Sequence, residues 1–179
     1  MQEVTINKQA RLSQHFTLGE LCKTSAKTQD GNIPSHVHIE NLKRLCGWLE
    51  VLRKRYNERY VIPPPCHLER SREISPRAAL GRDDKEEPIV INSGYRSPAV
   101  NKAVGGVATS NHLTGCAADI RVTGMEQLIR YAAILLDYAD ETGEEFDELL
   151  LEKNRSGAFW LHFAVKPKGN RHKVLFISV

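Results

Sequence analysis

The order and spacing of strand-like segments constrain the fold of this chain more than any other feature. Five such segments occur from residue 88 onwards, and they are joined mostly by hairpins or long loops rather than by repeated strand–helix–strand units. They cover residues 88–92, 117–122, 146–152, 159–165 and 173–178. Residues 154–157 are typical of a hairpin turn. This pattern predicts an α+β fold with a small, largely antiparallel sheet flanked by helices.

The helices are predicted by apolar spacing and by their end signals. Residues 37–56 place apolar side chains at helical spacing, and the opposite face is basic, which is typical of a solvated helix surface. Capping boxes at residues 17–20 and 123–126 predict the starts of two further helices. Ser97 followed by Pro98 predicts another start, because proline is well tolerated at the first helical position.

Residues 63–88 interrupt these patterns. They open with three prolines, end in a run of charged residues and show little apolar periodicity. A connection of this length without regular structure is uncommon inside a compact domain. We therefore expect a single domain over residues 1–179, with residues 63–88 forming a surface insertion that carries no chemistry.

Composition excludes several classes of function. The 179 residues carry a formal net charge of +3, the basic residues are scattered, and no aromatic platform accompanies them, so nucleic-acid binding is not expected. No stretch approaches the roughly 18 apolar residues of a membrane-spanning helix. The N-terminus lacks the apolar core of a signal peptide, and the four cysteines form no CxxC pair. We expect a monomer that is cytoplasmic as synthesised and does not insert into membranes.

The most informative stretch is residues 110–119. It places His112 at the end of a turn and Asp119 in the strand that follows. Imidazole nitrogen and carboxylate oxygen both bind zinc at about 2 Å. Gly115 can fold the loop back so that both side chains reach one point. A catalytic zinc keeps three protein ligands and one open position, so a third ligand is needed.

His162 is the candidate for that third ligand. Among the seven histidines, it alone sits inside a strongly apolar strand. A histidine in such a place is more often a core residue with satisfied hydrogen bonds than a metal ligand. The residues alone therefore leave both roles open, although a site built from one ligand on each of two neighbouring strands is sterically easy.

Three ordered motifs resemble those of the zinc D-Ala-D-Ala carboxypeptidase family. Residues 110–119 match its S-x-H-x-x-G-x-A-x-D pattern, residues 92–97 resemble its S-G-Y-R-S segment, and residues 160–162 resemble its W-x-H segment. The family includes VanX- and VanY-type enzymes and phage cell-wall lysins, and it shares its fold with the Hedgehog signalling domain. The resemblance covers nearly the whole chain except residues 63–88.

The resemblance implies roles for particular residues. It implies that zinc is the cofactor and that His112, Asp119 and His162 bind it. Arg96 takes the place of the family arginine that holds a substrate carboxylate or carbonyl, for which the planar guanidinium is suited. Tyr95 of the same segment is a further substrate-binding candidate. Ser110 either binds substrate or shapes its loop, and both roles stay open.

One family feature is missing. Related enzymes carry an acidic residue three positions before the last histidine as the general base, and here that position is Phe159. Peptide hydrolysis needs a group that accepts a proton from the attacking water. Glu152 is our first candidate and Glu148 our second. A four-residue turn would place His162 opposite Leu149 and direct both glutamates to the other face, whereas a bulge or another turn length would bring them to the site.

The resemblance thus implies a zinc-dependent peptidase. Its expected substrates are D-amino-acid-containing peptide bonds in the stem peptides of peptidoglycan, cut by a carboxypeptidase or an endopeptidase. A chain without a leader is compatible with a phage-type lysin released to the cell wall. The alternative is a non-catalytic zinc-containing module that binds the cell wall or belongs to a phage particle, because the Hedgehog relative shows that this fold also serves purposes other than hydrolysis.

Overall fold

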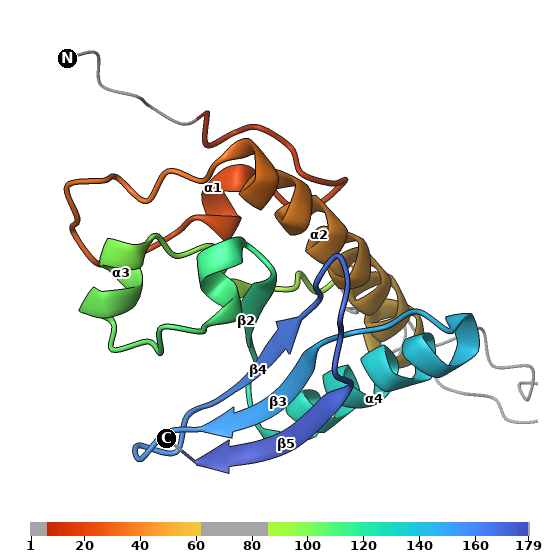
Figure 1. Ribbon diagram of the computed structural model, residues 1–179. Coiled ribbons are helices and arrows are strands. Elements are labelled where there is room, and N and C mark those ends of the chain that lie inside the picture. Colours follow the sequence, from red (N-terminus) through yellow and green to blue (C-terminus); the bar gives the residue numbers. More distant parts are fainter. Residues whose placement is uncertain (1–6, 62–85, 179) are drawn as a thin grey trace, which may run out of the picture.

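The structure, a computed structural model, describes residues 7–61 and 86–178 (Figure 1). The predicted insertion at residues 63–88 lies almost entirely outside the described residues. Among those that are described, no helix combines the length and the apolar composition needed to cross a membrane.

A five-stranded sheet forms the centre of the molecule, with the strand order β1-β2-β4-β3-β5. Its strands are β1 (Ile91–Ser93), β2 (Ala117–Arg121), β3 (Glu148–Lys153), β4 (Phe159–Ala164) and β5 (Lys173–Ser178). The pairs β1–β2, β2–β4 and β3–β4 are antiparallel, and the pair β3–β5 is parallel. All five strands overlap the strand-like segments predicted from the sequence, and the architecture is α+β.

The prediction of a largely antiparallel sheet is wrong, because the sheet is mixed. β4 is already flanked by β2 and β3, so the last strand can pair only at a free edge of the sheet. The chain leaves β4 at Ala164, which lies opposite Glu148 at the start of β3. A short connection across that end brings Lys173 beside Glu148, and β5 then runs in the same direction as β3. Figure 1 shows β5 at the outer edge of the sheet next to β3.

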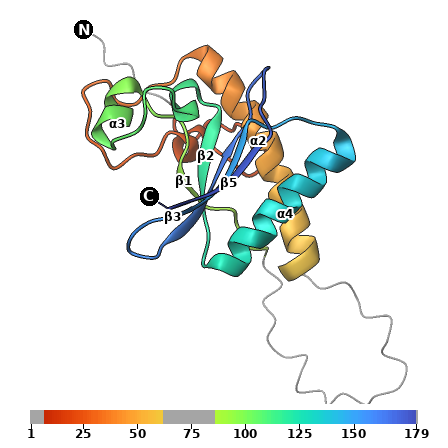
Figure 2. The ribbon, with the colours of Figure 1, turned by 60° about the horizontal axis from the view of Figure 1, so that its bottom comes forward.

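The helices are α1 (Leu18–Leu21), α2 (His36–Tyr56), α3 (Pro98–Ala103) and α4 (Met125–Thr142). A π-helical turn, η1 (Asn57–Val61), extends α2, and a 3₁₀ helix, η3 (Asn111–Thr114), precedes β2. Figures 1 and 2 show α2 and α4 on the same side of the sheet. Leu49, Leu135 and Phe163 belong to the buried core between these helices and the sheet. Because side chains alternate along a strand, the neighbours of Phe163 point to the opposite face.

The helix ends follow the predicted signals with one exception. Thr17 and Glu20 form the capping box of α1, and Ser97 caps α3 with Pro98 in its first turn. The predicted capping box of α4 is wrong: its N-cap is Gly124, which has no side chain to offer. The Gln127 side chain instead accepts a hydrogen bond from the backbone N–H of Thr123 at 2.8 Å.

Candidate metal centre

Two neighbouring strands and one short helix bring His112, Asp119 and His162 together. Asp119 on β2 and His162 on β4 are direct partners in the antiparallel ladder, so their side chains lie side by side on one face. η3 carries His112, and the chain then turns at Gly115 into β2. The pairing of the two strands and the tight turn therefore bring together the three residues that the motifs predict as metal ligands.

The three side chains form a compact, buried group of donor atoms. Asp119 Oδ1 lies 2.9 Å from His162 Nδ1 and 3.2 Å from His112 Nε2, and the three donor atoms lie within 4.8 Å of one another. The residues are only 2% to 9% exposed. A tetrahedral zinc with bonds of about 2.0–2.1 Å separates its ligand atoms by roughly 3.3 Å. The group therefore fits a small divalent cation of this kind, with two nitrogen donors and one oxygen donor.

The hydrogen bonding of His112 also suits a metal ligand. Its Nδ1 lies 2.6 Å from the carbonyl oxygen of Gly94, and because a carbonyl can only accept, Nδ1 carries the proton. In the neutral imidazole, Nε2 then presents a lone pair to Asp119 Oδ1. Two acceptors at this distance repel each other unless a proton or a metal ion lies between them. Metal-binding histidines usually donate their other N–H to a carbonyl or carboxylate in this way.

Charges inside the group compensate for its burial. Burial alone would raise the pKa of Asp119, but the charge and hydrogen bonds of the two histidines hold it well below its usual range. Burial alone would lower the pKa of His162, but its contacts with Asp119 and Glu148 raise that pKa to about 9. Asp119 is thus ionised at neutral pH, as an anionic metal ligand must be.

The register of the β3–β4 hairpin decides where the two candidate bases point. His162 lies opposite Leu150, not opposite Leu149, because the hairpin loop is one residue longer than the predicted turn. Side chains alternate along a strand, so Glu148 and Glu152 lie on the same face as His162. The longer turn therefore directs both glutamates to the face of the sheet that carries the metal group.

The two glutamates differ in their surroundings. Glu148 Oε2 lies 3.7 Å from His162 Nε2, and Oε1 lies 2.9 Å from Arg171 Nη2. Its interactions with His162 and Arg171 outweigh burial and lower the pKa of Glu148 to about 2. The pKa of Glu152 is raised, mainly because burial disfavours its charged form. Glu152 is the more basic of the two carboxylates.

The three predicted substrate-binding residues lie in different surroundings. Arg96 reaches the group, because its Nη2 donates to Asp119 Oδ2 and its Nε donates to Ser93 at 2.8 Å. Ser110 caps η3, and its hydroxyl accepts a hydrogen bond from the backbone N–H of His112 at 3.3 Å. Tyr95 is buried in the core, where its ring stacks on His38. Tyr95 is therefore not brought to the metal group.

Residues 77–143 match the Peptidase M15 family. The matched part is less than half of the chain, begins within the 63–88 segment, and contains Arg96, His112 and Asp119 but ends before His162. The match supports a metallopeptidase of the M15 kind, a family of zinc-dependent enzymes that includes the D-Ala-D-Ala carboxypeptidases. No curated protein matches the chain significantly.

The 3₁₀ helix η3 lies within the part of the chain that matches Peptidase M15. It ends at Gly115, where steric contacts require glycine. Gly115 has φ +70°, and a Cβ there would lie 2.7 Å from the carbonyl oxygen of His38. We expect Gly115→Ala to destabilise the fold by at least 2 kcal/mol, about 1 kcal/mol of it from the left-handed backbone. Gly143, with φ +69° and nothing within 4 Å of its Cβ position, is the matched control and should lose only that backbone contribution. Urea unfolding measures both, and equal losses would contradict the close packing against His38.

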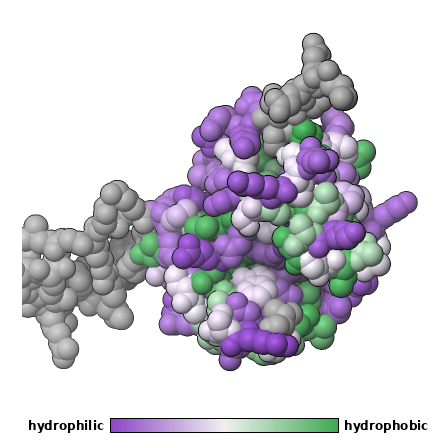
Figure 3. Space-filling view, turned by 90° about the vertical axis from the view of Figure 1, so that its left-hand side faces the viewer, coloured by the Kyte–Doolittle hydropathy of each residue, from purple (hydrophilic) through white to green (hydrophobic). Residues whose placement is uncertain are grey.

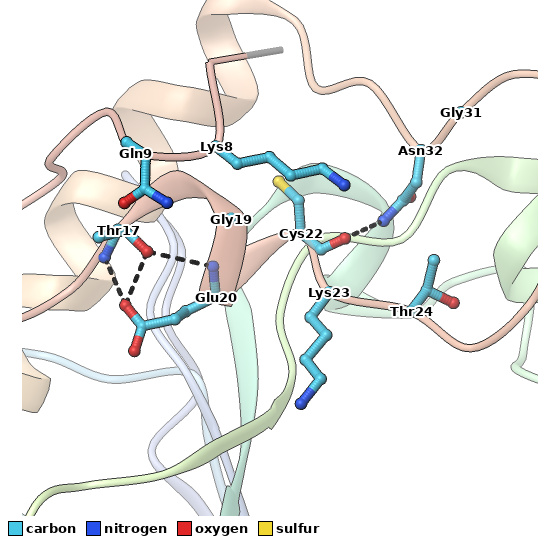
Figure 4. A pocket seen from close by; sticks show the side chains of 10 residues that line it. All are labelled: Lys8, Gln9, Thr17, Gly19, Glu20, Cys22, Lys23, Thr24, Gly31 and Asn32. Carbon is cyan, nitrogen blue, oxygen red and sulfur yellow. Dashed lines mark hydrogen bonds between the residues drawn. The ribbon is translucent and has the colours of Figure 1, made fainter. Parts of the chain in front are cut away.

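Two cavities lie near the metal-binding region, one at the N-terminal segments and one beside η3, and neither includes the metal group. One of about 430 Å³ lies between the N-terminal segments and is lined by Lys8, Cys22, Lys23 and Asn32, among others (Figure 4). Figure 3 shows the side of the molecule that is on the left in Figure 1, where hydrophilic residues alternate with small apolar areas. Another cavity, of about 400 Å³, borders the loop of His112 at Ser110 and Asn111. None of the three donor residues lines either cavity.

A set of polar residues beside the group was not predicted from the sequence. Asp147 is fully buried and makes ion pairs with Lys166 and Arg171. Asn111, which precedes His112, donates hydrogen bonds to both Asp147 and Glu148. Asn111 could have been noticed because it directly precedes a predicted metal ligand. The other residues belong to no motif and occur in ordinary charged stretches of the sequence.

Proposed function

We propose that this protein is a zinc-dependent peptidase that hydrolyses D-amino-acid-containing peptide bonds in the stem peptides of peptidoglycan. The observation that carries the proposal is the buried group of His112, Asp119 and His162, whose donor atoms lie within 4.8 Å of one another and could hold a metal ion. The match to Peptidase M15 supports the same class of reaction.

In this proposal the three donor residues hold the metal through His112 Nε2, Asp119 Oδ1 and His162 Nδ1. When bound, zinc supplies Lewis-acid chemistry: it polarises the scissile carbonyl and lowers the pKa of water towards 7. The hydrogen bond from His112 Nδ1 to Gly94 keeps Nε2 directed at the centre.

Glu152 is the proposed general base. It lies on the same face of the sheet as His162, and burial raises its pKa towards the range in which a carboxylate accepts protons well. Glu152 takes the proton of the attacking water and returns it to the leaving amine. Glu148 is the second candidate, but its low pKa and its ion pairs with Arg171 and His162 make it a weak base.

Arg96 is the proposed anchor for the substrate. Its guanidinium reaches Asp119 and is oriented by Ser93, so it stands directly beside the metal group. A planar guanidinium can donate two parallel hydrogen bonds to a peptide carboxylate or carbonyl. Ser110 supports the reaction indirectly by capping the helix that carries His112.

A non-catalytic role in binding the cell wall or in a phage particle is the second candidate function. Phe159 favours it, because an apolar ring occupies the position at which related enzymes carry their acidic base. In that case the metal would serve stability alone. The presence of Glu152 on the site face argues for catalysis.

The test is digestion of purified peptidoglycan by the protein, with chelator and then with added zinc, followed by mass spectrometry of the fragments. We expect zinc-dependent release of fragments, and their masses distinguish removal of a terminal D-amino acid from cleavage of a crosslink. The variant His112→Ala is the control for contaminating hydrolases. Zinc binding without any released fragment would reject the peptidase and favour the non-catalytic module.

A further inference from the structure

A charged cluster beside the metal group joins two segments that are distant in the sequence. Arg171, in the connection between β4 and β5, donates from Nε to Asp147 Oδ1 at 2.8 Å and from Nη2 to Asp147 Oδ2 at 2.6 Å. The same Nη2 lies 2.9 Å from Glu148 Oε1. A single guanidinium therefore holds two consecutive carboxylates, one of which is fully buried.

The cluster contacts the surroundings of both histidines. Asn111 Nδ2 donates to Asp147 Oδ2 at 2.8 Å and to Glu148 Oε2 at 3.0 Å, and Asn111 directly precedes His112. Glu148 Oε2 in turn lies 3.7 Å from His162 Nε2, on the side of the ring opposite to Nδ1 and Asp119. The contacts therefore link the residue that directly precedes His112 to the imidazole of His162.

We propose that Arg171, Asp147, Asn111 and Glu148 form a positioning cluster that orients the two histidines of the metal centre. Glu148 holds Nε2 of His162 and so turns Nδ1 towards the metal, while Asn111 holds the backbone that carries His112. Arg171 and Asp147 keep Glu148 and Asn111 in place. This inference rests on the metal centre of the proposed function, but not on hydrolysis.

The charge of the cluster supports this role. Burying a carboxylate such as Asp147 costs free energy unless the carboxylate is paired and hydrogen-bonded. If the cluster served only to attach the β4–β5 connection, uncharged side chains could do so at a lower cost in free energy. A fork of donors that reaches Asp147 and Glu148 together gives a fixed geometry, which arginine provides and lysine does not. Carboxylates that hold a metal-binding imidazole from its far side affect metal affinity and activity by about 10–100-fold.

Replacing Arg171 by methionine tests the cluster. We expect Arg171→Met to weaken zinc binding about tenfold or more, measured by competition with a chelating dye, because Glu148 loses its nearest cationic partner and keeps only Asn111 and the more distant Lys173. The visible spectrum of Co²⁺ bound in place of zinc should also change, since it reports ligand geometry. Arg155→Met is the matched control, because Arg155 is an exposed arginine in the β3–β4 hairpin loop, and it should change neither measurement.

Melting temperatures of the metal-free proteins separate positioning from stability. The Arg171 side chain is 51% exposed and Asp147 keeps its ion pair with Lys166, so the replacement leaves no buried charge unpaired. Arg171→Lys, which keeps the charge without the fork, should show an intermediate loss of zinc affinity. Zinc affinities of both Arg171 variants within twofold of the Arg155→Met control would overturn the proposal. A wild-type protein that binds zinc without hydrolysing peptidoglycan would reject the peptidase and leave the cluster standing, whereas a wild type that binds no zinc would reject both.

Discussion

His162→Ala is expected to abolish zinc-dependent hydrolysis and to weaken zinc binding by more than a hundredfold. The expected loss exceeds the roughly 10–100-fold that follows removal of an outer hydrogen-bond partner, because a direct ligand disappears. His162 is buried between Asp119 and Glu148, and alanine offers no donor in its place. Zinc affinity is measured by competition with a chelator, and hydrolysis by release of peptidoglycan fragments.

His36→Ala is the control for this substitution. His36 is an exposed histidine at the start of α2, so its loss removes an imidazole without touching the metal group. It should keep the zinc affinity and activity of the wild type. A His162→Ala variant that binds zinc within tenfold of the wild type would show that the ion is held elsewhere.

Glu152→Gln is expected to lower kcat by about 10²–10⁴-fold while leaving zinc affinity nearly unchanged. Glutamine has the size of glutamate but cannot accept the proton of the attacking water. Among the described contacts, the hydrogen bonds of the three donor residues do not involve Glu152, so its replacement should not disturb the metal. Rates measured at saturating zinc separate the effect on catalysis from any effect on metal binding.

Glu148→Gln is the matched comparison on the same strand and the same face of the sheet. It should weaken zinc binding, because Glu148 faces His162, and it should recover most of its activity when zinc is saturating. The reverse pattern, with Glu148→Gln inactive at saturating zinc and Glu152→Gln active, would transfer the role of base to Glu148.

Local patterns predicted most of the fold. Short strand-like segments located the five strands, and Ser97 with Pro98 marked the start of α3, because both signals depend only on neighbouring residues. The parallel pairing of β5 could not be predicted in the same way. It depends on which sheet edge is free after β4 has been placed between β2 and β3, and no local pattern contains that information.

The candidate site shows the same division. The spacing of His112 and Asp119 is local, but their meeting with His162 follows from the direct pairing of β2 with β4. One extra residue in the β3–β4 loop decides the face to which Glu148 and Glu152 point, and loop length is poorly determined by sequence.

The remaining differences concern side-chain contacts. The charges of Asp147 and Arg171 look like ordinary surface charges until the fold brings them together. Tyr95 belongs to the predicted substrate segment, yet the close approach of this segment to α1 turns its ring into the core. Such contacts join residues far apart in the chain, and a single sequence carries no pattern for them.

Anomalous X-ray scattering at the zinc absorption edge, from crystals of the protein grown with zinc, is the most direct measurement of the metal centre. We predict one strong peak about 2.0–2.2 Å from each of His112 Nε2, Asp119 Oδ1 and His162 Nδ1. A zinc peak at any other place, with these three side chains joined only by hydrogen bonds, would contradict the metal centre on which the proposed peptidase depends.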